Sequence, residues 1–195
     1  YLLILVLASY LALGLHHLDK FVTADEHYWV SERIPQYWDA VSQGKWRKTF
    51  INDKPGVSLA LVSGVATAVY PQSEEHCIEM DDKTIDCRAL ETSALYQAFR
   101  LPVLIINGLL LLVLYFLIAR LTTSLTALLA VTLMALSPVL LGISQILNPD
   151  SLLWSFGSVG LFSFLVFLKE NDWRFILLTC ISTGLALLSK YAALS

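Results

Sequence analysis

Residues 101–119 read LPVLIINGLLLLVLYFLIA and contain no charged side chain. A helix needs roughly 20 mostly apolar residues to cross a bilayer, so this stretch is long enough to span one. Outward from it, the same pattern predicts four more spans, at about residues 1–18, 123–147, 151–168 and 174–192. Apolar residues make up 56% of the chain and charged residues 15%, with a mean hydropathy of +0.66, which is outside the usual range of soluble domains. The sequence therefore predicts an all-α, polytopic transmembrane protein.

The sequence begins at Tyr1 within one apolar segment and ends at Ser195 directly after another. The opening run has no basic start and no small-residue cleavage site, so a secretory signal peptide does not account for it. We expect the chain to be the N-terminal part of a longer protein, with residues 1–195 inside a single transmembrane domain.

The polar part of the chain lies between residues 19 and 100. Apolar residues at helical spacing predict an amphipathic helix at about 25–43, bent near Pro35. Its many Trp and Tyr side chains suit the membrane–water interface. The stretch at 57–70, VSLALVSGVATAVY, is apolar but short and rich in small residues. We interpret it as a re-entrant or surface helix.

Residues 23–29, TADEHYW, place two adjacent carboxylates close to the first predicted span. Thr23 and Glu26 have the spacing of a capping box, which requires no catalytic role. This box leaves Asp25 unused. A carboxylate at the boundary between water and lipid suits a general base that takes the proton of an attacking hydroxyl.

The cysteines and histidines give weaker signals. Cys77 and Cys87 lie in one polar loop and would form a disulfide in an oxidising compartment, while the alternative is two free thiols. Cys180 lies in an apolar segment, where we expect a buried side chain. The histidines lack metal-ligand spacing, so no metal site is predicted. No phosphate-binding glycine loop and no basic, aromatic nucleic-acid surface is present in the sequence.

Six short motifs occur in a characteristic order along nearly the whole chain. They are Asp25-Glu26, Lys54-Pro55, Arg100-Leu101-Pro102, Ser137-Pro138, Asn148-Pro149-Asp150 and GLALLSK at 184–190. In this order they resemble the start of the glycosyltransferases of the GT-C fold that use lipid-linked sugars, namely the protein O-mannosyltransferases and the lipid A aminoarabinose transferases. One departure is Gly56, which stands where a second proline is common in such enzymes.

The resemblance implies transfer of a sugar, mannosyl, another hexosyl or aminoarabinosyl, from a polyprenyl-phosphate donor to a hydroxyl of a protein, lipid or glycan. It implies an integral membrane protein with its active face outside, in the plasma membrane if bacterial and in the endoplasmic reticulum if eukaryotic. Asp25 takes the role of base, Glu26 positions the acceptor, and Asp150 helps to shape the site. No cofactor is indicated, although a divalent cation is compatible with the chemistry.

The leaving phosphate of the donor is an anion, so a positive charge near it would stabilise it as it departs. The resemblance assigns this role to Lys54, Lys190 and Arg100. Each candidate also has a plainer interpretation. Asp150 opens a helix, where an acidic residue favours the helix dipole. Lys190 is placed to snorkel from a helix end, and Lys54 to lie solvated in a loop.

The topology depends on residues 57–70. The short loops between the later spans carry three basic residues, Arg120, Lys169 and Arg174. If 57–70 spans the membrane, residues 19–54 join these basic loops on the cytoplasmic side, which simple charge counting favours. If it does not, all of 19–100 is exported together with Asp150. The resemblance favours this second arrangement.

A transporter or lipid flippase is the alternative function, because charges near the membrane, such as Asp150 and Lys190, also mark transport pathways. A carrier usually shows broken helices or paired repeats in its spans. The long first loop argues against a carrier, so we expect the transferase.

Overall fold

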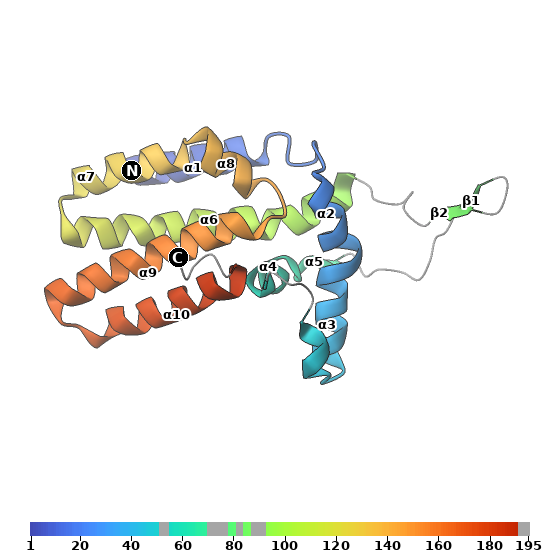
Figure 1. The fold of residues 1–195 in the computed structure, drawn as a ribbon. Coiled ribbons are helices and arrows are strands. Elements are labelled where there is room, and N and C mark those ends of the chain that lie inside the picture. Colours follow the sequence, from blue (N-terminus) through green and yellow to red (C-terminus); the bar gives the residue numbers. More distant parts are fainter. Residues whose placement is uncertain (51–54, 70–77, 81–83, 87–92, 191–195) are drawn as a thin grey trace.

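The computed structural model describes residues 1–50, 55–69, 78–80, 84–86 and 93–190. It consists of a helical bundle with a helical arm across one end (Figure 1). The α-helices are α1 (Leu2–Leu15), α2 (Ala24–Tyr28), α3 (Ile34–Ser42), α4 (Val57–Ser63), α5 (Ala66–Val69), α6 (Ser93–Leu121), α7 (Ser124–Ala135), α8 (Pro138–Ser144), α9 (Pro149–Glu170) and α10 (Trp173–Ser189). A π-helical turn, Trp29–Arg33, joins α2 to α3, and a 3-10 turn, Trp46–Thr49, follows α3.

The predicted all-α fold class is confirmed, with one small addition. Strands β1 (Ile78–Met80) and β2 (Thr84–Asp86) pair antiparallel within the predicted polar loop. Cys77 and Cys87, the predicted disulfide, lie outside the described residues.

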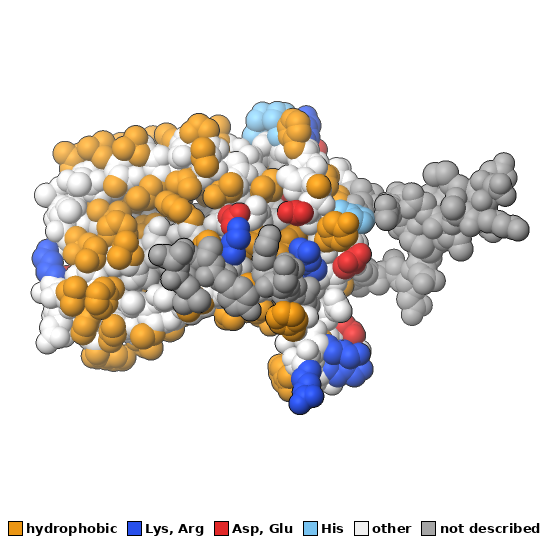
Figure 2. All heavy atoms as spheres, viewed as in Figure 1, with side chains coloured by type: hydrophobic (Ala, Val, Ile, Leu, Met, Phe, Trp, Pro, Cys, Tyr) orange, Lys and Arg blue, Asp and Glu red, His pale blue; other side chains and the backbone are white. Residues whose placement is uncertain are grey.

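Among the described residues, two helices, α6 and α9, are long and apolar enough to cross a membrane. The α7 and α8 pair passes the same test as one unit, while α1 and α10 are apolar but shorter. Much of the bundle surface is apolar, as Figure 2 shows, and α7 presents Leu125 and Leu133 outward. Such a surface fits a lipid environment. The prediction that Cys180 is buried was wrong, because α10 turns this side chain outward.

The predicted single span at 123–147 is interrupted in the structure. Helices α7 and α8 are bent by 62° at a short break. Ser137 adopts an extended conformation with ψ 122°, and Pro138 opens α8. Proline has no N–H to donate to the preceding turn and disfavours a helical conformation in the residue before it, so a break at this dipeptide is expected.

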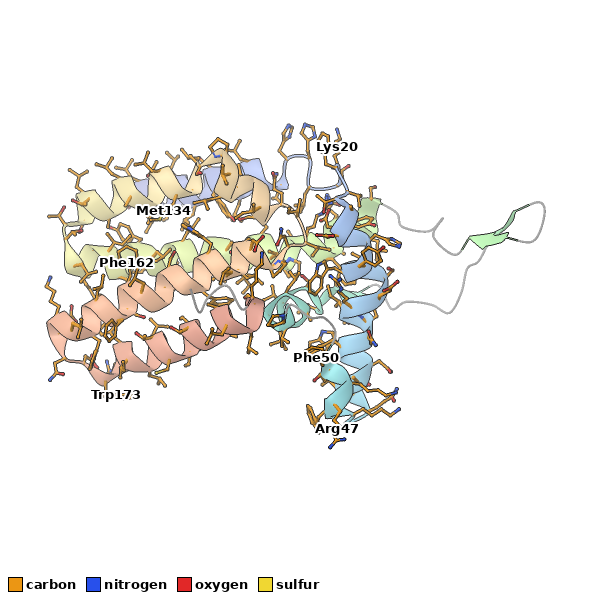
Figure 3. All side chains as sticks on the ribbon, viewed as in Figure 1. Lys20, Arg47, Phe50, Met134, Phe162 and Trp173 are labelled. Carbon is orange, nitrogen blue, oxygen red and sulfur yellow. The ribbon has the colours of Figure 1, made fainter. Side chains whose placement is uncertain are left out.

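The arm formed by α2, the π-helical turn and α3 runs across the end of the bundle (Figure 1). Pro35 occupies the first turn of α3, where its missing N–H costs little. The π-helical turn just before Pro35 is where the hydrogen-bond pattern of the arm changes. Figure 3 places Arg47 at the far tip of the arm, while Lys20 and Trp173 lie at opposite ends of the bundle.

Two clusters of buried residues hold these parts together. One cluster, inside the bundle, joins α1, α6, α7 and α9. The other joins the arm to the bundle and contains Trp29, Ile34, Leu59, Phe99 and Leu152. Because the second cluster draws on five different segments of the chain, the arm is a packed part of the structure, which keeps its polar residues in a defined place.

Gly56 shows why the start of α4 departs from the pattern of the resembling enzymes. Its φ is +59°, a left-handed conformation that proline, with φ fixed near −65°, cannot adopt. A Cβ at Gly56 would also lie 2.0 Å from the Trp29 ring. Both the backbone and the packing therefore require glycine here.

Candidate active site

Glu26 is the centre of the polar network at the arm end of the bundle. Its side chain is fully buried. Oε2 accepts the Thr23 N–H at 2.8 Å, which completes the predicted capping box. The carboxylate also accepts from Arg100 Nε and Nη2, both at 2.8 Å, and from the Leu147 N–H at 2.7 Å. One carboxylate thus ties together the arm, α6 and the segment that leads into α9.

Arg100 is as buried as its partner, with 1% of its side chain exposed. Nη1 donates to the carbonyls of Leu18 and Lys20, at 2.6 and 2.9 Å, and Nη2 also donates to that of Phe21 at 2.9 Å. Together with the two bonds to Glu26, these contacts occupy all five N–H donors of the guanidinium. The predicted role of Arg100 in binding the donor phosphate stays a prediction, and in this geometry no N–H group is left for it.

Asp150 and Lys190 form a second ion pair at the same end of the bundle. Lys190 Nζ lies 2.7 Å from Asp150 Oδ1, and the side chains are 30% and 39% exposed. Asp150 lies in the first turn of α9, where its N–H donates to Asn148 Oδ1 at 2.9 Å, and Lys190 is the C-cap residue of α10. The pair therefore joins the start of one helix to the end of the next while remaining accessible to solvent.

Asp25 lies in the first turn of α2 and is exposed. No partner of its carboxylate is found among the residues that the structure describes. Its neighbour Glu26 binds the N–H of Leu147, three residues before Asp150. Asp25 and Asp150 are thereby placed at the same end of the bundle.

Lys54 lies outside the described residues, but the chain that follows it is well anchored. The Gly56 N–H donates to the Ser189 carbonyl at 3.0 Å, and Ser58 Oγ donates to the Leu185 carbonyl at 2.6 Å. The start of α4 is therefore attached to the end of α10, next to Lys190. Four motifs that are far apart in the sequence therefore lie at this end: Asp25-Glu26, Arg100-Leu101-Pro102, Asn148-Pro149-Asp150 and GLALLSK at 184–190.

Gln145 is a residue that the sequence analysis missed. Its Nε2 lies 3.2, 3.0 and 3.1 Å from the carbonyl oxygens of Leu13, Gly14 and His16. Leu13 and Gly14 lie in the last turn of α1, where helix geometry leaves carbonyls without intrahelical partners, and His16 is the C-cap residue of this helix. Gln145 thus fixes the segment between α8 and α9 to the end of α1. The sequence signal that could have identified Gln145 is its position as a polar residue directly after the apolar helix α8.

An apolar bundle with a crosswise arm, and with carboxylates and cations gathered at one end, defines a polytopic membrane protein with a polar site at one face. A family model described as dolichyl-phosphate-mannose-protein mannosyltransferase matches residues 92–194, a little more than half of the chain. The chain belongs to this family: it is a membrane glycosyltransferase that uses a polyprenyl-phosphate-linked sugar donor.

The family match covers α6 to α10, and so includes Arg100, Asp150 and Lys190 but not Asp25 or Glu26. No curated protein and no solved structure matches the chain.

Proposed function

We propose that this protein transfers a mannosyl group from a polyprenyl phosphate to a hydroxyl acceptor on the exported face of its membrane. The acceptor is a protein, lipid or glycan, and that face is outside the plasma membrane in a bacterium or in the lumen of the endoplasmic reticulum in a eukaryote. The observation that carries the proposal is the Glu26 network, because it brings the segments of Asp25, Asp150 and Lys190 to one end of an apolar bundle.

This position suits a donor whose polyprenyl chain lies in lipid and whose sugar phosphate lies in water. In the proposed reaction, the acceptor oxygen attacks the anomeric carbon and its proton passes to the Asp25 carboxylate. The bond between the anomeric carbon and the phosphate oxygen breaks, and polyprenyl phosphate leaves with the electron pair. The Asp25 carboxylate is exposed and has no partner among the described residues, so it is available to accept the proton.

Lys190, with Lys54, is proposed to stabilise the phosphate. Its ammonium group has three N–H donors, and Asp150 uses one of them. Two N–H groups therefore remain for a phosphate while the contact with Asp150 is kept. Glu26 and Arg100 are proposed as positioning residues, because their contacts hold the arm and the α8–α9 segment in register.

The test of the base is Asp25→Asn in the full-length enzyme, with sugar transfer measured in membranes from a radiolabelled polyprenyl-phosphate mannose. Loss of a positioned base lowers the rate by roughly 10²–10⁴-fold, and we expect a loss in this range with membrane insertion and donor binding retained. The matched control is Asp39→Asn, an exposed aspartate on the same arm. Full activity in Asp25→Asn would exclude this residue as the base.

The test of the phosphate contact is Lys190→Gln. Loss of one hydrogen bond to a charged group weakens binding by roughly 10–100-fold, so we expect the KM for the donor to rise within that range and kcat to fall less. An unchanged KM would remove Lys190 from the donor site.

A further inference from the structure

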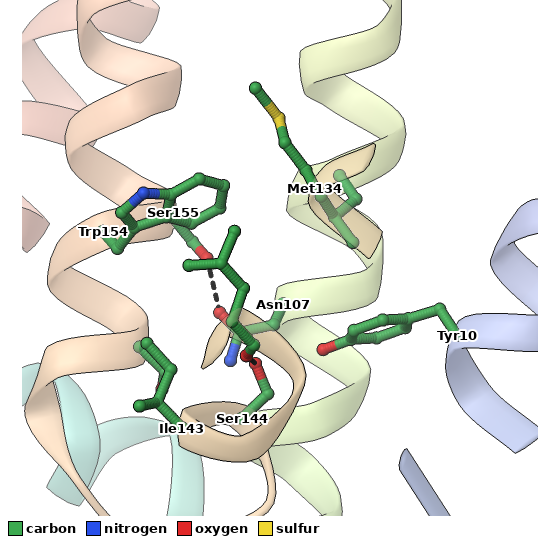
Figure 4. Close-up of a pocket in the computed structure, with 10 residues that line it drawn as sticks. Tyr10, Asn107, Met134, Ile143, Ser144, Trp154 and Ser155 are labelled. Atoms are coloured by element: carbon green, nitrogen blue, oxygen red, sulfur yellow. Dashed lines mark hydrogen bonds between the residues drawn. The ribbon is translucent and has the colours of Figure 1, made fainter. Parts of the chain in front are cut away.

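A small, partly enclosed cavity with both polar and apolar lining lies between α1, α6, α7, α8 and α9 (Figure 4). Its polar side chains are Tyr10 of α1, Asn107 of α6, Ser144 of α8, and Ser151 and Ser155 of α9. The cavity volume is about 10 Å³, which is room for about one water molecule. The cavity is separate from the proposed active site, because none of Asp25, Glu26, Arg100, Asp150 or Lys190 lines it.

Within the described part of the chain, two of these side chains carry buried polar atoms that make no hydrogen bond of normal geometry, although the Ser144 side chain interacts with the Tyr10 hydroxyl. They are the Tyr10 hydroxyl and the Asn107 Nδ2, and each residue is only 2% exposed. Ser155 Oγ donates to Asn107 Oδ1 at 2.6 Å, as Figure 4 shows, so the amide nitrogen is the end left over. Exchanging the amide oxygen and nitrogen does not change this conclusion, because Ser155 has one hydroxyl and can engage only one end.

An unmet hydrogen bond is more costly in a membrane protein than in a soluble one. A buried donor inside an apolar bundle has no bulk water to turn to, so an unmet hydrogen bond costs more there than at a surface. Ser144 Oγ donates to the Leu140 carbonyl at 2.8 Å and keeps lone pairs free to accept. The cavity therefore offers two donors and one acceptor around a space of the right size.

We propose that this cavity is a binding site for one ordered water molecule. The water accepts an N–H from Asn107, exchanges a hydrogen bond with the Tyr10 hydroxyl and donates to Ser144. Three partners are the usual number for a buried water. The water links α1 and α6 to α8, the second half of the broken pair, and α8 leads directly into the segment of Gln145 and Asp150.

The test is Tyr10→Phe in the full-length protein, with thermal unfolding followed in detergent. If the water is bound, the variant removes one of its partners, and we expect the Tm to fall by about 2–4 °C. If the cavity is dry, the variant removes only a hydroxyl that faces Ser144 without a hydrogen bond of normal geometry, so the Tm falls by less than this or does not fall. That result would overturn the proposal.

The matched control is Tyr115→Phe, which removes a tyrosine hydroxyl from α6 away from the cavity and is expected to leave the Tm within error of the native protein. A second measurement is direct. An experimental structure at a resolution that shows ordered water should have density between Tyr10, Asn107 and Ser144, and that density should be lost in Tyr10→Phe. Native side chains without density between them would contradict the proposal. Neither readout depends on sugar transfer.

Discussion

At the scale of single residues, the buried Glu26–Arg100 pair has the clearest energetic consequence. Two charges removed from water stabilise a fold only when each is paired and its remaining donors and acceptors are satisfied. Here every N–H of Arg100 has an acceptor, and Glu26 accepts four hydrogen bonds. The free energy of unfolding should therefore fall when either partner of the pair is changed.

Glu26→Gln keeps the size of the side chain and removes its charge, which leaves Arg100 as an uncompensated buried cation. Breaking a buried pair in this way costs about 3–5 kcal/mol, and we expect a loss of this size in thermal or chemical unfolding in detergent. The matched control is Glu170→Gln, which breaks the exposed Arg120–Glu170 pair and should cost less than about 1 kcal/mol. An equal loss of unfolding free energy in the two variants would show that the Glu26 network stabilises the protein no more than an exposed ion pair does.

At the scale of elements, the start of α4 is constrained both by its backbone conformation and by its packing. Gly56 combines a positive φ with direct packing against Trp29, and its N–H binds the end of α10. The glycine thus couples the arm, α4 and α10 at one point, beside Lys190.

Gly56→Ala should destabilise the protein by about 2–4 kcal/mol, from the left-handed backbone and from the overlap of the new Cβ with the Trp29 ring. The free energy of unfolding in detergent is the measurement. Gly142→Ala is the control, because Gly142 lies in α8 with no atom within 4 Å of an added Cβ. Alanine favours a helix over glycine by about 0.5–1 kcal/mol, so this variant should be neutral or slightly stabilising. A Gly56→Ala protein as stable as the control would refute the packing argument.

At the scale of the whole molecule, the helix directions separate two ends. The end of α1, the starts of α6 and α9, and the end of α10 lie with the arm, whereas Arg120, Lys169 and Glu170 meet at the other end. Helices α4 and α5 contain 7 and 4 residues, each far shorter than a membrane span. The arm and the site residues thus share one end, which we propose is the exported one.

Single cysteines, introduced after the native cysteines are replaced by serine, test this topology. We expect Gln43→Cys, on the arm, to react with a membrane-impermeant thiol reagent from outside. Asn171→Cys, between α9 and α10, should react only once the membrane is opened. Both positions are exposed, so lack of reaction reports sidedness and not burial. Labelling of both positions from the same side would exclude the proposed arrangement.

The sequence by itself determined the features that depend on neighbouring residues. Apolar runs of sufficient length specify α6 and α9, and the Thr23–Glu26 spacing specifies the capping box, because both depend on residues within one helix. The Ser137-Pro138 break was also accessible in principle, since proline acts on its own turn. The apolar composition of residues 123–147 nevertheless favoured a single span over a break at this dipeptide.

Only the tertiary structure decided which polar residues meet. Glu26 and Arg100 are 74 residues apart and Asp150 and Lys190 are 40 apart, so no local pattern records either pair. These residues meet because of the order and direction in which the helices pack. The two buried clusters hold the helices in that arrangement. The same packing left Asp25 exposed and made Glu26 the structural partner of Arg100. Adjacent carboxylates in the sequence thus acquired different surroundings because one points into the protein and the other into water.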